Sequence, residues 1–135
     1  MDQNGVRLML QFLDLGFVLF HSGLVLFNVI GWAFSKTRRL HLVVISLTIS
    51  SWVGLGYFFG FGYCPSTDWH WDVKRALGEQ ELPASWMKYY ADYITGRSWD
   101  VGLIDMVAGI VGVGALLLSV GLSIRDHASK RRDLQ

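Results

Sequence analysis

The sequence predicts an all-α integral membrane protein with three transmembrane helices and an outer, amphipathic cap of two helices rich in aromatic residues. Hydrophobic residues make up 52% of the 135 residues, and the mean hydropathy is +0.35. Three stretches, residues 8–34, 40–63 and 101–124, each approach the ~20 apolar residues that cross ~30 Å of hydrocarbon. This composition argues against a soluble domain, and we expect residues 1–135 to form a single membrane domain.

The first stretch carries a polar residue at every seventh position: Asp14, His21 and Asn28. Because a helix drifts by only ~20° per heptad, the three side chains share one stripe. Polar groups are costly where they face lipid, so we expect this stripe to face protein, water or a ligand. Structural roles are the alternatives. Asp14 can be solvated near a helix end, His21 can bond to Ser51 or to a backbone carbonyl, and Asn28 can hold helices together.

Basic residues are concentrated in the connection before the second stretch and in the carboxyl-terminal tail. They are Lys36, Arg38, Arg39, Arg125, Lys130, Arg131 and Arg132, seven of the twelve in the chain. The positive-inside rule therefore predicts a cytoplasmic connection and a cytoplasmic tail at residues 125–135, with the amino terminus and residues 64–100 outside. The tail carries no nucleic-acid-binding motif, so we expect no nucleic-acid partner. The first stretch is too long, and its amino end too acidic, for a cleaved signal peptide.

Small residues in the second and third stretches predict close helix packing. Gly56 and Gly60 form a Gly-x-x-x-Gly pair in the second stretch. The third stretch carries a seam of small residues: Ala108, Gly112, Ala115, Ser119 and Ser123. Packing within the chain, self-association and docking on a larger membrane complex are the alternatives for these residues.

The segment between the second and third stretches is expected to form the cap. Ser66 or Thr67 can cap a first helix that Gly78 ends, and Ser85 can cap a second helix that Gly96 ends. Aromatic side chains crowd this segment and favour the depth of the lipid headgroups: Trp69, Trp71, Trp86, Tyr89, Tyr90, Tyr93 and Trp99. The segment is then either an interfacial anchor or a lid over an outward-facing pocket.

Helix geometry predicts which polar groups of the first two stretches lie at one depth. With a turn at residues 36–37, His21 is level with Ser51, whereas His41 is level with Trp32. At a rise of ~1.5 Å per residue, the two histidines are then ~16 Å apart along the membrane normal. This separation argues against a haem or a metal ion shared by His21 and His41.

A candidate ligand site follows from the same arithmetic. The third stretch is expected to run parallel to the first, which places Asp105 level with Asp14 and Gly112 level with His21. Two carboxylates beside a histidine would make a polar pocket in the outer leaflet. The candidate ligand-binding residues are His21, Asp14, Asp105, Asn28, His41, Thr48 and Ser51. His41 also has an alternative role as an interfacial residue next to Arg38 and Arg39.

The motif Cys64-Pro65-Ser66-Thr67 follows the second stretch and is continued by Asp68 and His70. Together with His21 and the pair Leu40-His41, it resembles a family of small bacterial integral-membrane proteins described as a domain of unknown function. The family's motif is Cys-Pro-Leu-Thr, and here Ser66 replaces the usual leucine. The resemblance covers roughly residues 12–120. It implies a bacterial inner membrane and no particular activity, and it makes His21, His41, Cys64 and Thr67 the residues to test first.

The residues of this motif also include groups that could form a chemical site. Cys64, Asp68 and His70 are donors within a short segment, but zinc sites usually show a tighter repeated pair of Cys or His, so we expect no metal. A single cysteine forms no intramolecular disulfide, so Cys64 is either buried and inert or free for an intermolecular bond. Pro65 suits the first turn of a helix. No phosphate loop and no spaced nucleophile and base argue for catalysis, so we expect no cofactor and do not predict an enzyme.

Two functions fit these observations. The leading hypothesis is a non-catalytic subunit or scaffold that packs as a homo-oligomer or in a larger membrane complex through its small-residue seams. The alternative is a binder or translocator of a small ligand, an ion or a proton through the pocket around Asp14, His21 and Asp105. Co-purifying proteins would favour the first hypothesis, and a bound ligand would favour the second.

Overall fold

A computed structural model describes residues 2–132, and the regular elements of this part of the chain are helices, without a strand. The elements in order are α1 (Gln3–Ile30) with a 3₁₀ turn (Gly31–Ala33), α2 (Arg38–Ser50), a π-helical turn (Ser51–Leu55), α3 (Gly56–Phe59), α4 (Pro65–Ala76), α5 (Trp86–Thr95) and α6 (Val101–Arg132). Three continuous helical segments are long and apolar enough to cross a membrane: Gln3–Ala33, Arg38–Phe59 and Val101–Arg132. The prediction of an all-helical protein with three such segments is confirmed.

The ends of the three long helices differ from the predicted ones for local reasons. α1 begins before residue 8 because the Asp2 carboxylate caps it, accepting a hydrogen bond from the Gly5 amide at 2.8 Å. The second segment ends at Phe59 because Gly60 adopts a φ of 103°, which a helix does not continue. α6 continues to Arg132, so the basic tail is helical up to that residue, and residues 133–135 lie outside the described part.

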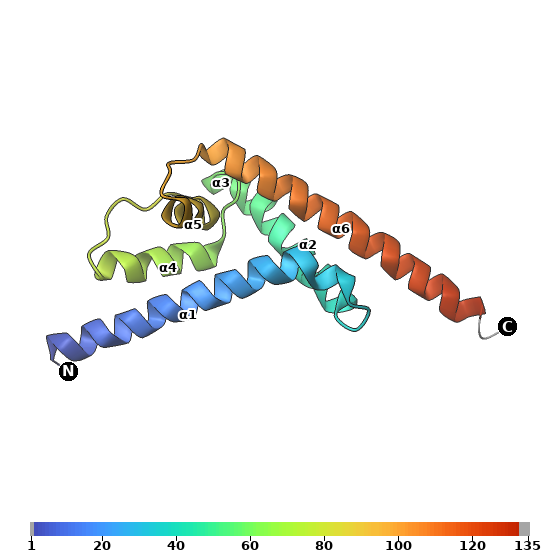
Figure 1. The fold of residues 1–135 in the computed structure, drawn as a ribbon, viewed down its shortest axis with the longest axis horizontal. Helices are drawn as coiled ribbons and strands as arrows, with labels where there is room; N and C mark the ends of the chain where they lie inside the picture. Colours follow the sequence, from blue (N-terminus) through green and yellow to red (C-terminus); the bar gives the residue numbers. More distant parts are fainter. Residues whose placement is uncertain (1, 133–135) are drawn as a thin grey trace.

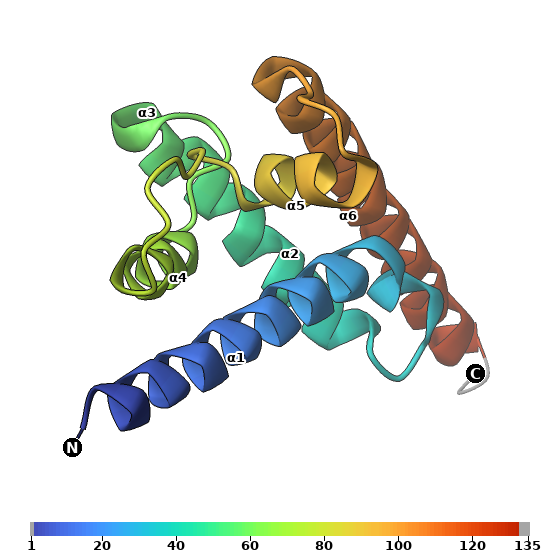
Figure 2. The ribbon, with the colours of Figure 1, turned by 60° about the vertical axis from the view of Figure 1, so that its left-hand side comes forward.

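The long helices form an open fan (Figure 1). α1 and α6 run in the same general direction and lie closest near the turn after α1, and they diverge toward their amino ends, as a second view shows (Figure 2). α2 lies between them and makes its most extensive contact with α6. α4 packs along α1 and α5 packs against α6, so these two shorter helices occupy the opening of the fan. The expected parallel alignment of the first and third helices is therefore only approximate.

The narrow end of the fan is held by a buried histidine that contacts all three long helices. His41 of α2 is fully buried. Its Nε2–H donates to the Asn28 carbonyl of α1 at 3.0 Å, and its Nδ1 accepts from the Ser119 hydroxyl of α6 at 3.1 Å. An added Cβ at Gly31 would lie 2.9 Å from the His41 ring, so only glycine fits there. His41 is therefore a buried residue of a helix junction, and its position at the membrane interface next to Arg38 and Arg39 stays a prediction.

The small residues of α6 serve packing within the chain. Ala108, Ala115 and Ser119 are the buried residues of this helix. Gly112 does not belong to the contact, because an added Cβ there would meet no atom within 4 Å. The Gly56 and Gly60 pair has a different role from the predicted one: an added Cβ at Gly56 would lie 3.2 Å from the Phe61 backbone, so this glycine allows the chain to turn back.

Two helices, α4 and α5, lie between the second and third long segments as predicted, and their starts differ in mechanism. Ser85 caps α5 as predicted, since its hydroxyl accepts from the Lys88 amide, and Gly96 ends the helix with a φ of 65°. α4 begins at Pro65 after Cys64, without any side-chain cap. The prediction that Ser66 or Thr67 caps this helix is therefore wrong. Both hydroxyls lie near His21 Nε2 instead.

Candidate functional site

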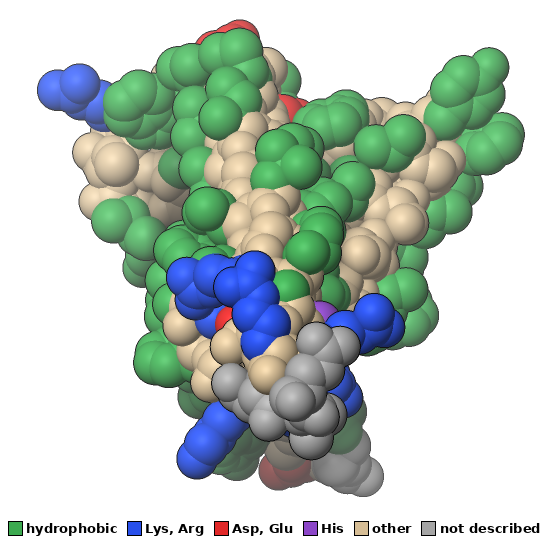
Figure 3. Space-filling view, turned by 90° about the vertical axis from the view of Figure 1, so that its right-hand side faces the viewer, with side chains coloured by type: hydrophobic (Ala, Val, Ile, Leu, Met, Phe, Trp, Pro, Cys, Tyr) green, Lys and Arg blue, Asp and Glu red, His purple; other side chains and the backbone are tan. Residues whose placement is uncertain are grey.

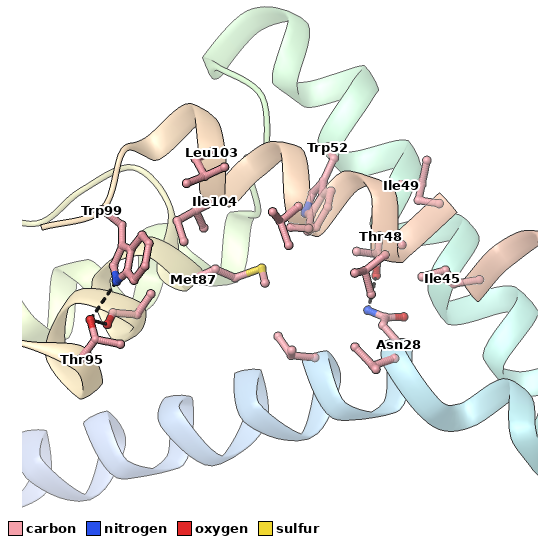
Figure 4. Close-up of a pocket in the computed structure, with 17 residues that line it drawn as sticks. Asn28, Ile45, Thr48, Ile49, Trp52, Met87, Thr95, Trp99, Leu103 and Ile104 are labelled. Carbon is pink, nitrogen blue, oxygen red and sulfur yellow. Dashed lines mark hydrogen bonds between the residues drawn. The ribbon is translucent and has the colours of Figure 1, made fainter. Parts of the chain in front are cut away.

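Two adjoining cavities lie in the opening of the fan. The large cavity has a volume of about 640 Å³ and is lined mainly by apolar residues of α1, α2, α5 and α6. Met87 of α5 extends into it from the side opposite Ile45 and Ile49 of α2 (Figure 4). The small cavity has a volume of about 80 Å³ and shares lining residues with the large one, among them Asn28 and Thr48.

Most of the candidate residues from the sequence line the small cavity. They are His21, Asn28, Thr48, Ser51, Cys64, Thr67 and Asp105. Ser51 belongs to the π-helical turn Ser51–Leu55, whose wider geometry is frequent at functional sites. The small cavity thus brings together residues of α1, α2, α6 and the motif after Gly62. Helical periodicity alone could not show this.

His21 is the buried centre of this group, with 4% of its surface exposed. Its Nδ1 lies 2.9 Å from the Phe17 carbonyl oxygen, which only accepts, so in the neutral ring Nδ1 carries the proton. Nε2 is then the free acceptor, and it lies 3.1 Å from the Ser66 hydroxyl and 3.4 Å from the Thr67 hydroxyl. The backbone carbonyl that the sequence offered as a partner is present, whereas Ser51 donates to the Tyr63 carbonyl at 3.0 Å.

Cys64 continues the hydrogen bonds from His21. Its Sγ lies 3.0 Å from the Ser66 hydroxyl, and this hydroxyl is hydrogen-bonded to His21 Nε2. Burial by itself raises the pKa of the Cys64 thiol, but hydrogen bonding to His21 and Ser66 outweighs burial and lowers this pKa from 9.0 to about 7. A lowered pKa favours the thiolate form of Cys64. The residue is half-buried and not fully buried.

The ring of His21 is held in place by neighbouring rings, two of which stack on it. The Trp86 ring of α5 stacks on it at a centroid distance of 5.1 Å, and the His70 ring of α4 stacks on it at 5.7 Å. Phe17 stacks on His70 at 5.2 Å. These contacts fix the orientation of His21 and couple it to both cap helices.

Asp14 belongs to a separate charged cluster between α1 and α4. Its carboxylate accepts from His70 Nε2–H at 2.7 Å and lies 3.3 Å from the Lys74 ammonium. Lys74 is buried and also pairs with Glu79 at 3.0 Å, and Glu79 accepts from the Tyr89 hydroxyl at 2.6 Å. Burial lowers the pKa of His70 despite its bond to Asp14, which favours a neutral ring at physiological pH.

The expected pocket of Asp14, His21 and Asp105 is therefore divided. Asp105 lines the small cavity beside Gly62, whose φ of 83° requires glycine, while Asp14 pairs with α4 outside that cavity. Gly112 lines the large cavity and does not face His21 across the small one. Asp68 accepts from the Tyr63 hydroxyl at 2.6 Å and does not line either cavity.

A metal site is not formed by the residues that the structure describes, since no group of three or more His, Cys, Asp or Glu side chains converges there. The chemistry available at the small cavity is therefore that of a thiol, hydroxyl groups, an imidazole and a carboxylate. These groups suit hydrogen bonding to a polar head and proton transfer.

Comparison with known proteins gives one match. The model of the family described as "Protein of Unknown function (DUF2784)" matches residues 11–124. The chain belongs to this family. No curated protein and no solved structure matches it. The matched region of this DUF2784 member contains both cavities' lining residues and the cluster around Asp14.

The sequence analysis missed Lys74 and did not foresee that His70 faces the first helix, and one signal could have shown both. Thr67, His70, Trp71 and Lys74 are the buried residues of α4 and follow helical spacing, so they form one face of that helix. This pattern would have directed His70 and Lys74 toward the first helix. No comparable signal pointed to Ser66 as the partner of His21, because its position in the first turn suggested a cap.

Proposed function

We propose that the protein binds one amphiphilic small molecule within the membrane. The observation that carries this proposal is that a large apolar cavity adjoins a small cavity where polar groups converge. The apolar chain of the ligand occupies the large cavity, whose volume of about 640 Å³ lies within the roughly 300–1,000 Å³ of small-molecule sites. The polar head lies in the small cavity among His21, Cys64 and Asp105.

We further propose that the narrow end of the fan faces the cytoplasm of a bacterial inner membrane, with the amino terminus and the cap outside. The charge distribution supports this orientation, because Lys130, Arg131 and Arg132 occupy the last turn of α6. Figure 3 shows Lys and Arg side chains gathered at that end, below a surface covered mainly by hydrophobic side chains. In this orientation α4 and α5 form an outer lid, since Trp86, Met87 and Ala91 of α5 line the cavities.

The role as a non-catalytic subunit or scaffold stays a prediction. The seam of small residues that favoured it is used within the chain, since Ala108, Ala115 and Ser119 are buried. A homo-oligomer or a larger complex would therefore have to use other faces of the long helices.

Binding can be tested by filling the large cavity. Gly112 lines the large cavity and an added Cβ there meets no atom within 4 Å, so we expect the side chain of Gly112→Leu to occupy part of the cavity. Monopalmitoylglycerol serves as an uncharged, single-chain amphiphile, and native mass spectrometry from detergent micelles counts the bound molecules. We expect one bound molecule in the wild-type protein and an affinity at least about tenfold weaker in Gly112→Leu, equivalent to ~1.4 kcal/mol.

Gly121→Leu is the matched control, because it lies on the same helix, has the same open surroundings and lines neither cavity. It should bind like the wild-type protein. Equal affinities in both variants, or no binding by the folded wild-type protein, would refute the proposal. A stoichiometric partner protein in the same spectra would favour the scaffold role.

A further inference from the structure

Cys64, Ser66 and His21 form a continuous chain of hydrogen-bonding groups at the small cavity. The sulfur lies 3.0 Å from Ser66 Oγ, and Ser66 Oγ lies 3.1 Å from His21 Nε2. The other nitrogen of His21 is committed to the Phe17 carbonyl. His21 is buried, and its Nε2 is thus linked through the Ser66 hydroxyl to Cys64, the single cysteine of the sequence.

This arrangement has the parts of an activated nucleophile. A nucleophilic thiol needs a base within hydrogen-bonding reach and a further group that orients the base. His21 is the base, Ser66 transmits the proton, and the Phe17 carbonyl fixes the tautomer. The lowered pKa of Cys64, about 7, agrees with a thiol that loses its proton readily.

The surroundings of the sulfur restrict what it can attack. Cys64 lines the small cavity, which adjoins the large apolar cavity at Asn28 and Thr48. A long hydrocarbon chain in the large cavity would therefore present a carbonyl group at its polar end to the sulfur. A membrane supplies such molecules as acyl esters of glycerolipids.

We propose that Cys64 is a nucleophile that accepts the acyl chain of a glycerolipid ester as a thioester. This inference rests on the proposed function, since the acyl chain occupies the same large cavity.

In this step the Cys64 sulfur attacks the ester carbonyl carbon. Its proton passes to Ser66 while the Ser66 proton passes to His21 Nε2. The bond between the carbonyl carbon and the ester oxygen breaks, and the leaving alkoxide takes the proton back from His21 through Ser66. The products are S-acylated Cys64 and a lysolipid alcohol, with no change of oxidation state.

Acylation can be measured directly in the protein. The purified protein is placed in nanodiscs of phosphatidylethanolamine whose acyl chains end in an alkyne, and the label is located by mass spectrometry. We expect a hydroxylamine-sensitive label on Cys64. His21→Asn should slow its appearance by about 10²-fold or more, as expected for loss of a general base. His127→Asn is the matched control, because His127 is exposed and contacts neither cavity.

A second measurement covers the case in which His21→Asn fails to fold. Alkylation of Cys64 by iodoacetamide should reach half its maximal rate at a pH of about 7 in the wild-type protein, and Ser66→Ala should move this midpoint upward. Absence of a thioester on Cys64 would overturn the inference. Equal labelling of folded Ser66→Ala, or of folded His21→Asn, and the wild-type protein would also overturn it.

Cys64→Ala separates this inference from the proposed function. This variant should still bind monopalmitoylglycerol but take no label. Binding without acylation in the wild-type protein would leave the ligand site standing and remove the nucleophile. If Gly112→Leu lost both the binding of monopalmitoylglycerol and the acyl label on Cys64, the result would support the ligand site and the nucleophile together.

Discussion

His41 is expected to be one of the most costly residues to remove, because it joins all three long helices at the narrow end of the fan. It is fully buried, and its two ring nitrogens bond to the Asn28 carbonyl of α1 and to the Ser119 hydroxyl of α6. His41→Ala removes both bonds and leaves a cavity against Gly31, whose Cα hydrogens face the ring. We therefore expect the fan to open and the folded state to lose stability.

The size of this loss can be estimated from its parts. Hydrogen bonds between membrane helices contribute ~0.6 kcal/mol on average and up to ~1.7 kcal/mol. Two such bonds therefore account for roughly 1–3 kcal/mol, and large-to-small changes at buried sites add the cost of a cavity. We expect about 2–4 kcal/mol for His41→Ala. Ser119→Ala removes one bond and little volume, so about 0.5–1.5 kcal/mol is expected.

The measurement is equilibrium unfolding in mixed micelles with increasing sodium dodecyl sulfate, followed by circular dichroism. His127→Ala is the matched control, because this histidine is exposed and bonds only to the Ser123 carbonyl of its own helix. The reasoning would be wrong if His41→Ala unfolded at the same detergent fraction as His127→Ala. It would also be wrong if Ser119→Ala were as costly as His41→Ala.

Three further predictions concern the cap and the topology. Asp14→Asn removes the carboxylate that accepts from His70 at 2.7 Å, so we expect α4 to detach more readily from α1, seen as faster amide hydrogen exchange in α4 with α6 unchanged. Unchanged exchange in α4 would contradict this. Ser85→Ala removes the cap of α5 and should lower stability by ~0.5–2 kcal/mol in thermal unfolding, and an unchanged melting temperature would contradict this role of Ser85. A reporter active in the cytoplasm should work after Gln135, and one active outside should work at the exposed turn of Gly78; reversed activities at both positions would refute the orientation.

Features that depend on local chemistry could be predicted from the sequence. Three apolar stretches predicted three helices of spanning length, since length and hydropathy suffice for that inference. Ser85 and Gly96 predicted the start and end of α5 correctly, because a serine cap and a left-handed glycine act within one turn. The same reasoning failed for α4, where Ser66 and Thr67 turn toward His21 instead of capping the helix.

Features that depend on how helices meet could not be predicted in the same way. Depth arithmetic assumes parallel helices, whereas α1 and α6 diverge, so Asp14 and Asp105 do not share a pocket. The π-helical turn Ser51–Leu55 shifts the residues after it and leaves no signal in the hydrophobic pattern. Nothing in the neighbours of His41 along the chain indicated that it would be fully buried.

The polar stripe of α1 shows how one periodic pattern serves different purposes along a helix. A step of seven residues advances the helix by ~10.5 Å, so each polar side chain meets a different neighbour. Asp14 pairs with α4, and Asn28 donates to Thr48 of α2 at 3.1 Å, so both hold helices together. His21, between them, has one nitrogen committed to its own backbone and the other directed at Ser66. Of the three, His21 alone is linked through a hydroxyl group to the thiol of Cys64, so His21 is the member of the stripe whose contacts fit a chemical role.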